Sequence, residues 1–305
     1  MNKIDKDLLA QIADLHGVPE GSYNIRKDGE SIDRASSAEI EIVSKKDKNG
    51  IDIFVKPNTK NKSVHIPVIV TKGGFSDLVY NDFYIGENSE VVIVAGCGIH
   101  NVTDKNSEHS GIHNLHIGKG AKVKYIEKHL ATGDGVGEKI LNPVTKIMLS
   151  EGSVLEMETI QLGGVTYSNR KTNATLLKDS HLIIKEKILT TSTQYAKTVF
   201  NVNLKESNCS AEVVSRSVAK DKSKQEFVSN LIGNAECYGH VECDAILIND
   251  AKIVSVPKIT ANCVSANLVH EAQIGKIAGD QLTKLMTLGL TEKEAEDLII
   301  KGYLS

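Results

Sequence analysis

The 305-residue chain has no tryptophan, and aromatic residues make up only 4% of it. Few aromatics among many Val, Ile, Thr and Ser residues favour thin, regular β layers over a packed helical globule. Five cysteines are an odd number and too sparse for a disulfide framework, which predicts reduced thiols. No apolar run reaches membrane-spanning length and the first residues lack an apolar signal region. We therefore expect a cytoplasmic protein that contacts no membrane.

Several enzyme signatures are also missing. A net charge of −3 gives no electrostatic reason to expect nucleic-acid binding. The chain has no GxxxxGK(S/T) motif and no GxSxG motif, which predicts no nucleotide-binding P-loop and no serine-hydrolase elbow of its own.

A repeat begins near residue 81. Each unit has an Ile or Leu, a few small or charged residues and then a β-rich run. The first five units start at Ile85, Ile117, Leu149, Leu177 and Leu204, which are 32, 32, 28 and 27 residues apart. Because one such unit cannot bury its own apolar face, a nearly constant period predicts stacked units. A β-helix fits best, and a β-sandwich or cupin-like barrel is the competing interpretation.

The region before the repeat contains a helix and short strands. Residues 4–15 place Leu8, Ile12 and Leu15 at helical spacing. Residues 40–43, 51–55 and 64–70 read as strands, and Pro67 predicts that the last of them lies at a sheet edge.

The tail after the repeat predicts two short helices. Residues 280–288 form the first, ended by Gly289, and Thr291 with Glu294 forms a capping box for the second. The tail could cover the open end of the β stack or dock a partner, and both interpretations fit the apolar pattern.

Histidines, cysteines and carboxylates gather in two places. The first holds Cys97, His100, His109, His113, His116 and His129. The second holds Cys237, His240, Glu242, Cys243, Cys263, His270 and Glu271. Thiolate, imidazole and carboxylate are the usual ligands of zinc and iron. Neither cluster has the doubled CxxC spacing of a closed zinc site, and a single His or Cys on a strand is more often structural.

The second cluster lies in motifs that resemble the SufB/SufD family of the SUF iron–sulfur assembly system. They are Gly239-His-Val-Glu-Cys-Asp-Ala-Ile-Leu-Ile248, Leu268-Val-His-Glu-Ala272, Ile274-Gly-Lys-Ile277, Asp280-Gln-Leu282 and Leu288-Gly-Leu-Thr-Glu-Lys-Glu-Ala295. Ala95-Gly-Cys97 and Ser215-Arg-Ser-Val218 are weaker matches. The resemblance covers roughly residues 80–305 and is specific as an ordered set of motifs.

The resemblance implies a mainly β fold, with a right-handed parallel β-helix core, a short N-terminal helical segment and a C-terminal helical domain. We therefore expect an N-terminal helix and β region at 1–80, a β-helix core at 81–265, and a helical ATPase-docking region at 266–305.

The resemblance also implies site residues. Cys243 matches the cysteine implicated in binding the nascent cluster, and His270 and Glu271 match the histidine and glutamate placed near it at the subunit interface. The chain departs from the family at Val269, where SufB has a glutamate, so one possible ligand is missing.

Weaker assignments complete the site. Cys97 is similar to a cysteine associated with sulfur entry, and Cys237 is a second sulfur-transfer candidate. His240 and Glu242 are further possible cluster or metal ligands. Cys209 and Cys263 receive no role.

The function implied by the resemblance is a scaffold on which iron–sulfur clusters are assembled and from which they are transferred. The chain would not itself be an enzyme. It would hold a transient cluster, of the 4Fe–4S type, and no nucleotide, while a SufC-type ABC ATPase supplies ATP hydrolysis. A cysteine desulfurase or sulfide would donate sulfur, and apo iron–sulfur proteins would receive the cluster. Because one chain carries both the Cys and the His-Glu motif, we expect a homodimer.

Two other functions remain open from the residues alone. A β-helix or cupin-like metal-dependent enzyme would use the cluster between His100 and His116. A non-catalytic interaction protein would merely bury its cysteines.

Overall fold

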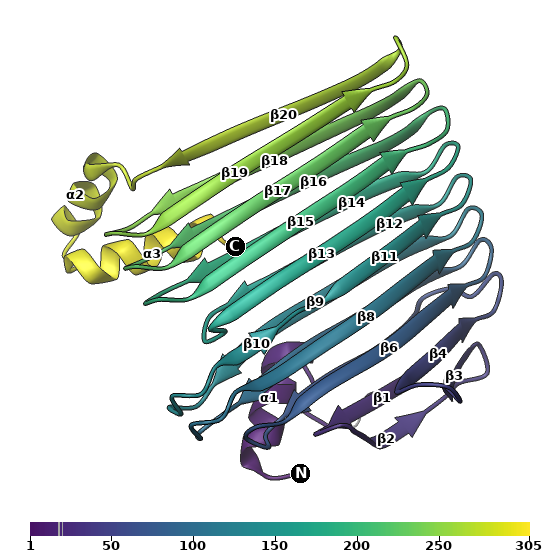
Figure 1. Cartoon of the computed structure of the whole chain (residues 1–305), viewed down its shortest axis with the longest axis horizontal. Helices are drawn as coiled ribbons and strands as arrows, with labels where there is room; N and C mark the ends of the chain where they lie inside the picture. Colours follow the sequence, from purple (N-terminus) through teal and green to yellow (C-terminus); the bar gives the residue numbers. More distant parts are fainter. Residues whose placement is uncertain (18, 20) are drawn as a thin grey trace.

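The computed structural model, which describes residues 1–17, 19 and 21–305, is a parallel β-solenoid of about 8 turns with short helices at both ends (Figure 1). Each turn adds one strand to each of two sheets, and strands of successive turns pair in parallel. The predicted parallel β-helix is confirmed. The sandwich and cupin-like alternatives are wrong, because in-register parallel pairing between turns, and not antiparallel pairing within them, builds both sheets.

The bounds of the elements follow the order of strands in each sheet. The helices are α1 (Lys3–Ala13), α2 (Gly279–Thr287) and α3 (Glu292–Tyr303). Sheet A runs β2 (Glu30–Ala35), β1 (Ser22–Lys27), β5 (Lys62–Val70), β7 (Glu90–His100), β9 (Lys122–Thr132), β12 (Val154–Leu162), β14 (His181–Thr190), β16 (Cys209–Ala219), β18 (Cys237–Leu247), β20 (Ala266–Gly275). Sheet B runs β19 (Lys252–Ala261), β17 (Lys224–Gly233), β15 (Tyr195–Leu204), β13 (Tyr167–Leu176), then β10 (Lys139–Leu141) and β11 (Val144–Leu149) side by side, β8 (Ser107–Ile117), β6 (Ser76–Ile85), β4 (Gly50–Val55), β3 (Ile40–Ser44).

The repeat marks one turn of the solenoid. Ile85, Ile117 and Leu149 end successive strands of sheet B and pair with one another across β6, β8 and β11. The polar residues that follow form the turn into sheet A. In the fourth unit the residue that pairs with Leu149 is Leu176, which lies one residue before the predicted start at Leu177. Alternate residues of each strand point between the sheets, where Ile, Leu and Val side chains form one continuous core.

The N-terminal end of the solenoid is closed. β1–β2 and β3–β4 are antiparallel pairs that end sheets A and B. The predicted N-terminal helix is α1, which lies on the outer face of β5, β7 and β9. Glycine makes this contact possible, because a Cβ at Gly96 would lie 2.6 Å from the carbonyl oxygen of Ile12. The same holds at Gly98, where a Cβ would lie 3.1 Å from Leu8 Cδ2.

Pro67 does not mark an edge strand, so that prediction is wrong. β5 lies between β1 and β7, and Pro67 pairs with Gly96 of β7. On the other side the pairing with β1 is interrupted between Tyr23 and Arg26. The sheet accommodates the missing N–H of proline through this local gap, next to the register shift after Ile25.

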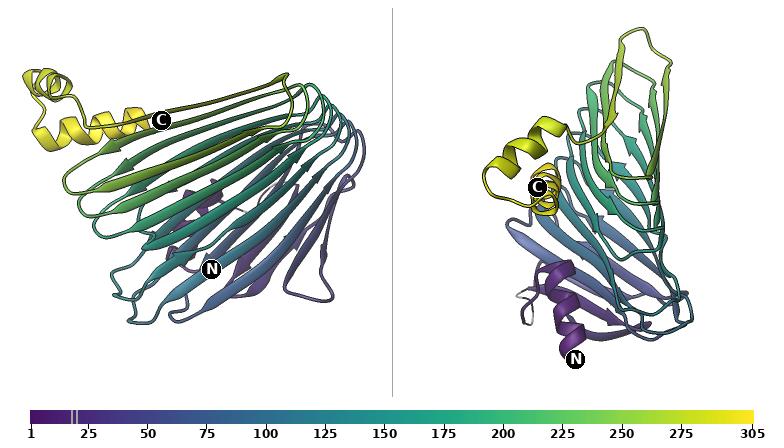
Figure 2. Two further views of the ribbon diagram at one scale, coloured as in Figure 1. Left: turned by 45° about the horizontal axis from the view of Figure 1, so that its top comes forward. Right: turned by 90° about the vertical axis from the view of Figure 1, so that its left-hand side faces the viewer.

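The C-terminal end is built differently. α2 and α3 project from one side of the solenoid, and α2 packs against α3 with no buried residue of its own (Figure 2). The predicted capping box is present, since Thr291 Oγ1 accepts from Glu294 N and Glu294 accepts from Thr291 N. Parallel pairing is continuous from β1 to β20, and the domain boundaries expected at 81 and 265 stay a prediction. Among the described residues, no helix has the length and apolarity needed to cross a lipid bilayer.

Candidate functional site

The last pair of strands in sheet A holds the residues singled out by the sequence. Within this pair Cys243 of β18 lies opposite Ala272 of β20, and His270 lies opposite Val241. Val241 and Cys243 belong to the core between the sheets, so His270 and Cys243 are diagonal neighbours on the inner face. Sequence and structure therefore agree that Cys243 and His270 come together.

The ring nitrogens of His270 are buried without partners, while the residue as a whole is half-buried. Neither Nδ1 nor Nε2 makes a hydrogen bond among the described residues. Burial lowers its pKa, and the nearby His240 lowers it further, which keeps the ring neutral at neutral pH. A neutral imidazole with an unused nitrogen lone pair is the form that coordinates a metal. A ring without hydrogen-bond partners in this position is therefore free to act as a metal ligand.

The Cys243 thiol is also held in its neutral form. It is 1% exposed. Burial raises its pKa to about 11, although the Ser255 hydroxyl of β19 opposes the shift. The thiolate is the metal ligand and the nucleophile, so Cys243 becomes reactive only when a nearby cation stabilises its charge.

Glu271 points the other way. It lies opposite Glu242 on the outer face of sheet A, together with His240 of β18. Ligand atoms of His240, Glu242 and Glu271 all lie within 4.8 Å of one another, and His240 Nε2 is 3.8 Å from Glu271 Oε2. We call these three residues the outer-face group. Because adjacent strand residues face opposite sides, His270 and Glu271 belong to two sites in one chain.

Val269 belongs to the outer face as well. It lies opposite His240. A glutamate at this position would therefore join the outer-face group and not the Cys243–His270 pair. The departure from the resembled family removes an oxygen ligand from the outer side only.

Helix α3 ends over the same outer surface. Ile300 and Leu304 pack against Val218 of β16, with Ile246 of β18 beside them. Burial raises the pKa of Tyr303, as does the carboxylate of Asp244, which follows Cys243 in β18. Burial and Asp244 also raise the pKa of Glu242. The helical tail thus reaches the strand that carries the candidate site.

A polar column leads away from Cys243 along the inner face of sheet A. In register on successive strands it contains Glu127, Thr159, Glu186, Ser215 and Cys243. Glu186 accepts from Ser215 Oγ at 2.7 Å and from Thr198 Oγ1 of the opposite sheet at 3.0 Å. Polar side chains in place of Ile or Leu therefore line one path through the core.

Arg170 compensates the carboxylates of this column. It donates to Glu127, its Nη2 lies 2.9 Å from His129 Nδ1, and its Nε lies 4.0 Å from Glu186. Burial alone would raise the pKa of Glu127, but Arg170 and His129 outweigh burial and hold it well below its usual value. Burial raises the pKa of Glu186 despite Arg170. The sequence analysis missed these residues. A signal was present, because they are charged residues at strand positions where the alternating pattern calls for an apolar side chain.

Cys97 lies at the other end of the path. It pairs with His129 and is 2% exposed, between the two glycines that support α1. His109, His113, Glu127 and His129 surround a cavity of about 10 Å³ beside it, with room for about one water molecule. Burial raises the pKa of Cys97 well above its usual value, and Asp77 and Glu127 add to the effect.

The first histidine cluster is divided between the faces. His109 lies 3.2 Å from Asp77, and His113 Nδ1 lies 2.6 Å from Tyr125 Oη. His116 instead stacks on Tyr84 on the outer face, and His100 contacts Thr132. Among the described residues, only the outer-face group places three potential ligand atoms within reach of one metal ion. These histidines do not form a shared metal site in this arrangement.

The three remaining thiols lie at or next to the turns that lead from sheet B into the last strands of sheet A. Cys209 and Cys237 pair across β16 and β18, and Cys263 lies in the turn before β20. Burial raises the pKa of Cys209 to about 11. Burial also raises the pKa of Cys237, and the nearby Cys263 contributes. Cys237 is six residues from Cys243 along the same strand, and the structure does not join the two.

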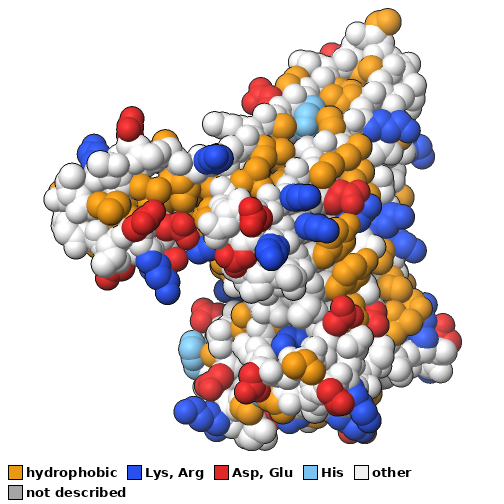
Figure 3. Space-filling view, turned by 60° about the vertical axis from the view of Figure 1, so that its left-hand side comes forward, with side chains coloured by type: hydrophobic (Ala, Val, Ile, Leu, Met, Phe, Trp, Pro, Cys, Tyr) orange, Lys and Arg blue, Asp and Glu red, His pale blue; other side chains and the backbone are white. Residues whose placement is uncertain are grey.

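The terminal rung is open. Ile259 of β19 and Ile274 of β20 pair with buried inner-face residues, yet they are 42% and 39% exposed because no further turn covers them. Hydrophobic side chains also lie on the projecting helices (Figure 3). There Met286, Leu288 and Leu298 are 44%, 76% and 50% exposed.

Comparison with known proteins gives a consistent result. The family model described as "SUF system FeS cluster assembly, SufBD core domain" matches residues 78–303. An iron–sulfur cluster assembly SufBD family protein of Methanocaldococcus jannaschii is 27% identical over 295 residues, which is 95% of this chain and 92% of that protein. A protein of the same description from Archaeoglobus fulgidus is 29% identical over 292 residues, 92% of this chain and 73% of its own length. A third protein of this description, from Pyrococcus horikoshii, is 27% identical over 281 residues, which is 84% of this chain and 78% of that protein.

The burial of Cys243 predicts slow alkylation. Its pKa of about 11 lies two units above the usual 9.0, which lowers the thiolate fraction at pH 8 by about 100-fold. Iodoacetamide should label the half-exposed Cys263 at least that much faster than Cys243 in the native protein, as followed by peptide mass spectrometry. Both should react at similar rates in denaturant. Equal native rates would show that Cys243 is open to solvent.

Proposed function

Because the chain belongs to the SufBD family of iron–sulfur cluster assembly proteins, we propose that it is a scaffold on which clusters are built and from which they are passed on. The cargo is a transient cluster of the 4Fe–4S type, and apo iron–sulfur proteins receive it. The chain performs no catalysis of its own, and nucleotide chemistry belongs to a partner.

One observation carries the proposal: Cys243 of β18 and the orphaned His270 of the uncovered last strand, β20, are diagonal neighbours on the inner face. A thiol and a neutral imidazole can both bind iron. Two ligands hold a cluster less firmly than four thiolates, which suits a cargo that must leave. The pair lies within one strand of the open end of the solenoid.

The outer-face group supports a second step. His240, Glu242 and Glu271 offer nitrogen and oxygen ligands, which suit a ferrous ion that has not yet met sulfide. We propose that Glu271 acts here, in holding iron for the site on the inner side of the same two strands. His240 and Glu242 then act as iron ligands and not as cluster ligands.

Cys97 and Cys237 remain the candidates for accepting sulfur from a desulfurase: the thiolate would attack the outer sulfur of the desulfurase persulfide, whose cysteine leaves as a thiolate. Sulfide would instead enter the cluster directly, without passing through these thiols. Burial disfavours the Cys97 thiolate that would attack a sulfur donor. Cys97 faces the core, on the opposite side of sheet A from α1, so we propose that the core beside it must open before sulfur is accepted there. The polar column from Glu127 to Ser215 connects the surroundings of Cys97 with Cys243 through the core.

Loss of the cluster site can be tested by anaerobic reconstitution with ferrous iron and sulfide. Cys243→Ala should lose most bound iron and acid-labile sulfide, and His270→Ala should retain them at least about tenfold less tightly. Cys209→Ala is the matched control, because that thiol is equally buried, with its pKa raised to about 11, and faces the same core. Equal cluster content in the Cys243 and Cys209 variants would contradict the proposal.

A homodimer would complete the site. β19 ends sheet B with Pro257 and Lys258, which discourage pairing at an edge, whereas β20 from Ala266 to Gly275 has no proline and no lysine. We propose that β20 and the uncovered apolar residues of the last rung meet a second copy. A second chain would supply the ligands that one chain lacks.

If two copies meet at the uncovered last rung, a charge placed there should weaken the dimer. Ile274→Lys places a charge on the uncovered rung and should raise the dimer dissociation constant at least about tenfold, measured by native mass and sedimentation. Val136→Lys is the control, since Val136 is 88% exposed in the turn between β9 and β10. A wild-type protein that is monomeric at every concentration would refute the dimer.

We further propose that α2 and α3 bind a SufC-type ABC ATPase. The helices project from the solenoid and expose Met286, Leu288 and Leu298, while α3 is anchored to β16 and β18. Lys220 of the turn after β16 also pairs with Glu296 of α3 at 2.6 Å. Movement of a bound ATPase can therefore reach the strand that carries Cys243.

Leu288→Asp tests the docking surface. It should weaken co-purification with the ATPase by at least about tenfold, because a charge at an apolar anchor is desolvated on binding. Cluster reconstitution on the isolated chain should be unchanged. Val136→Asp serves as the control, and equal retention of the ATPase by both variants would place its binding surface elsewhere.

A metal-dependent enzyme built on the His100–His116 cluster is not favoured. His109 and His113 are committed to Asp77 and Tyr125, and His116 faces the opposite side of sheet B.

A further inference from the structure

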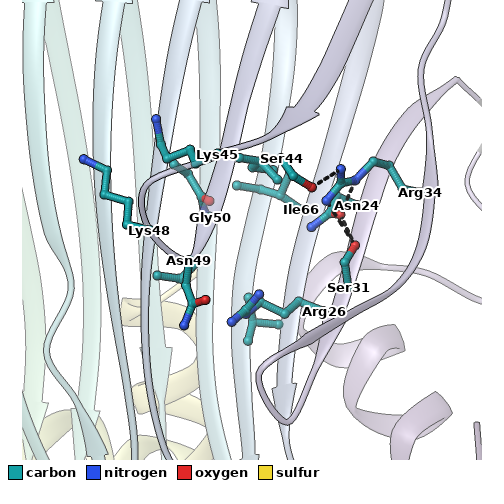
Figure 4. A pocket seen from close by; sticks show the side chains of 14 residues that line it. Asn24, Arg26, Ser31, Arg34, Ser44, Lys45, Lys48, Asn49, Gly50 and Ile66 are labelled. Carbon is teal, nitrogen blue, oxygen red and sulfur yellow. Dashed lines mark hydrogen bonds between the residues drawn. The ribbon is translucent and has the colours of Figure 1, made fainter.

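A polar cavity of about 210 Å³ lies at the N-terminal end of the solenoid, between the two hairpins that end its sheets (Figure 4). Its walls come from β1 and β2 on one side and from the β3–β4 turn on the other, with Ile66, Val68 and Val79 at its base. In the strand order this is the end opposite β18 and β20. The cavity is thus distinct from the cluster site and from the outer-face group.

Arg34 of β2 carries a charge that no carboxylate balances. Its guanidinium donates from Nε to Asn24 Oδ1 at 2.8 Å, from Nη1 to Ser44 Oγ at 2.7 Å and from Nη2 to Ser31 Oγ at 3.3 Å. All three acceptors are neutral, and no ion pair of Arg34 occurs among the described residues. Burial lowers its pKa, which reflects the cost of a partly desolvated charge.

Arg26 of β1 adds a second guanidinium. It is 8% exposed and donates from Nε and Nη2 to Asp77 at 3.0 and 2.9 Å. Within the described residues its Nη1 makes no hydrogen bond and its Nη2 makes one, so three of its five N–H groups remain available. Asn81, on the cavity wall and 4% exposed, has an Oδ1 atom without a partner. The Arg26 side of the wall is therefore buried and has unused N–H donors, whereas Ser31 and Ser44 lie at its exposed rim.

The remaining cations of the rim are already used. Lys45 binds Asp52 and Asp82, and the Lys48 ammonium lies 4.7 Å from the centre of the Tyr80 ring. No aspartate or glutamate is among the described residues that line the cavity. Two guanidinium groups against the single carboxylate of Asp77 leave the wall positive.

We propose that this cavity binds a small oxyanion, a phosphate, sulfate or carboxylate group held between Arg26 and Arg34. Guanidinium groups present a planar fork of donors that matches such oxygens. Ser44 supplies a hydroxyl donor, since its oxygen can donate outward while accepting from Arg34, whereas the Ser31 hydroxyl already donates to Asn24 Oδ1. A role for Arg34 confined to bracing the β1–β2 hairpin would need only its three neutral contacts and no cavity beside it.

The test is titration of the full-length protein with inorganic phosphate at fixed ionic strength, by calorimetry and by the rise in Tm. Sulfate and acetate in parallel distinguish tetrahedral from carboxylate ligands. Arg34→Gln should weaken phosphate binding at least about tenfold, which corresponds to the loss of one charge-assisted contact. Asn49→Asp adds a negative charge at the exposed rim without disturbing the core and should also weaken it.

Lys46→Gln is the matched control, because it removes a positive charge from an exposed residue next to the rim that does not line the cavity. It should bind phosphate as the wild type does. An equal loss in Lys46→Gln, full binding in both Arg34→Gln and Asn49→Asp, or no binding of any of the three anions at millimolar concentration would overturn the proposal. Cluster reconstitution should be normal in all three variants, so this test and that of the scaffold fail independently.

Discussion

In-register stacking of parallel strands is the constraint on which the whole structure depends. A residue on one turn lies directly beside its counterpart on the next, so side chains form columns that run along the solenoid axis. An apolar column buries itself by this stacking. A charged residue in such a column must find its partner in the neighbouring column or across the core, because desolvated charges cost several kcal/mol when unpaired. Glu127 and Glu186 meet this condition through Arg170 of the opposite sheet.

The two ends of the solenoid solve the same problem differently. At the N-terminal end, antiparallel hairpins close both sheets and α1 covers one face. At the C-terminal end the stack stops without a cover, and the inner residues of β19 and β20 are partly exposed. His270 lies on this last strand, and its ring nitrogens have no hydrogen-bond partner among the described residues.

Much of the fold was readable in the sequence because its signals are local. The period near 30 residues, the capping box at Thr291 and the spacing of Leu8 and Ile12 each lie within a few residues or a simple repeat. Pro67 was misread because proline propensity describes an isolated strand, whereas here a gap in the pairing with β1 absorbs the missing donor. Arg170 and Glu127 are 43 residues apart, and only the register of both sheets brings them together.

The candidate site was predictable as a set of residues but not as a geometry. His270 and Glu271 are adjacent in sequence and were read as one pair of ligands. The strand places them on opposite faces, and pairing with Val241 and Glu242 decides which residue faces inward. That decision depends on the register with β18, which no short motif encodes.

The direction of β20 has a consequence for any symmetric assembly at the open end. A two-fold axis perpendicular to the strands reverses their direction, so two copies of β20 would meet antiparallel although every strand beside them runs parallel. The midpoint of Ala266–Gly275 falls between His270 and Glu271. Opposed residues of an antiparallel pair share a face, so the axis must pass level with a residue. An axis level with His270, next to that midpoint, would place His270 opposite its own copy on the inner face, and the second copy would supply ligands that one chain lacks.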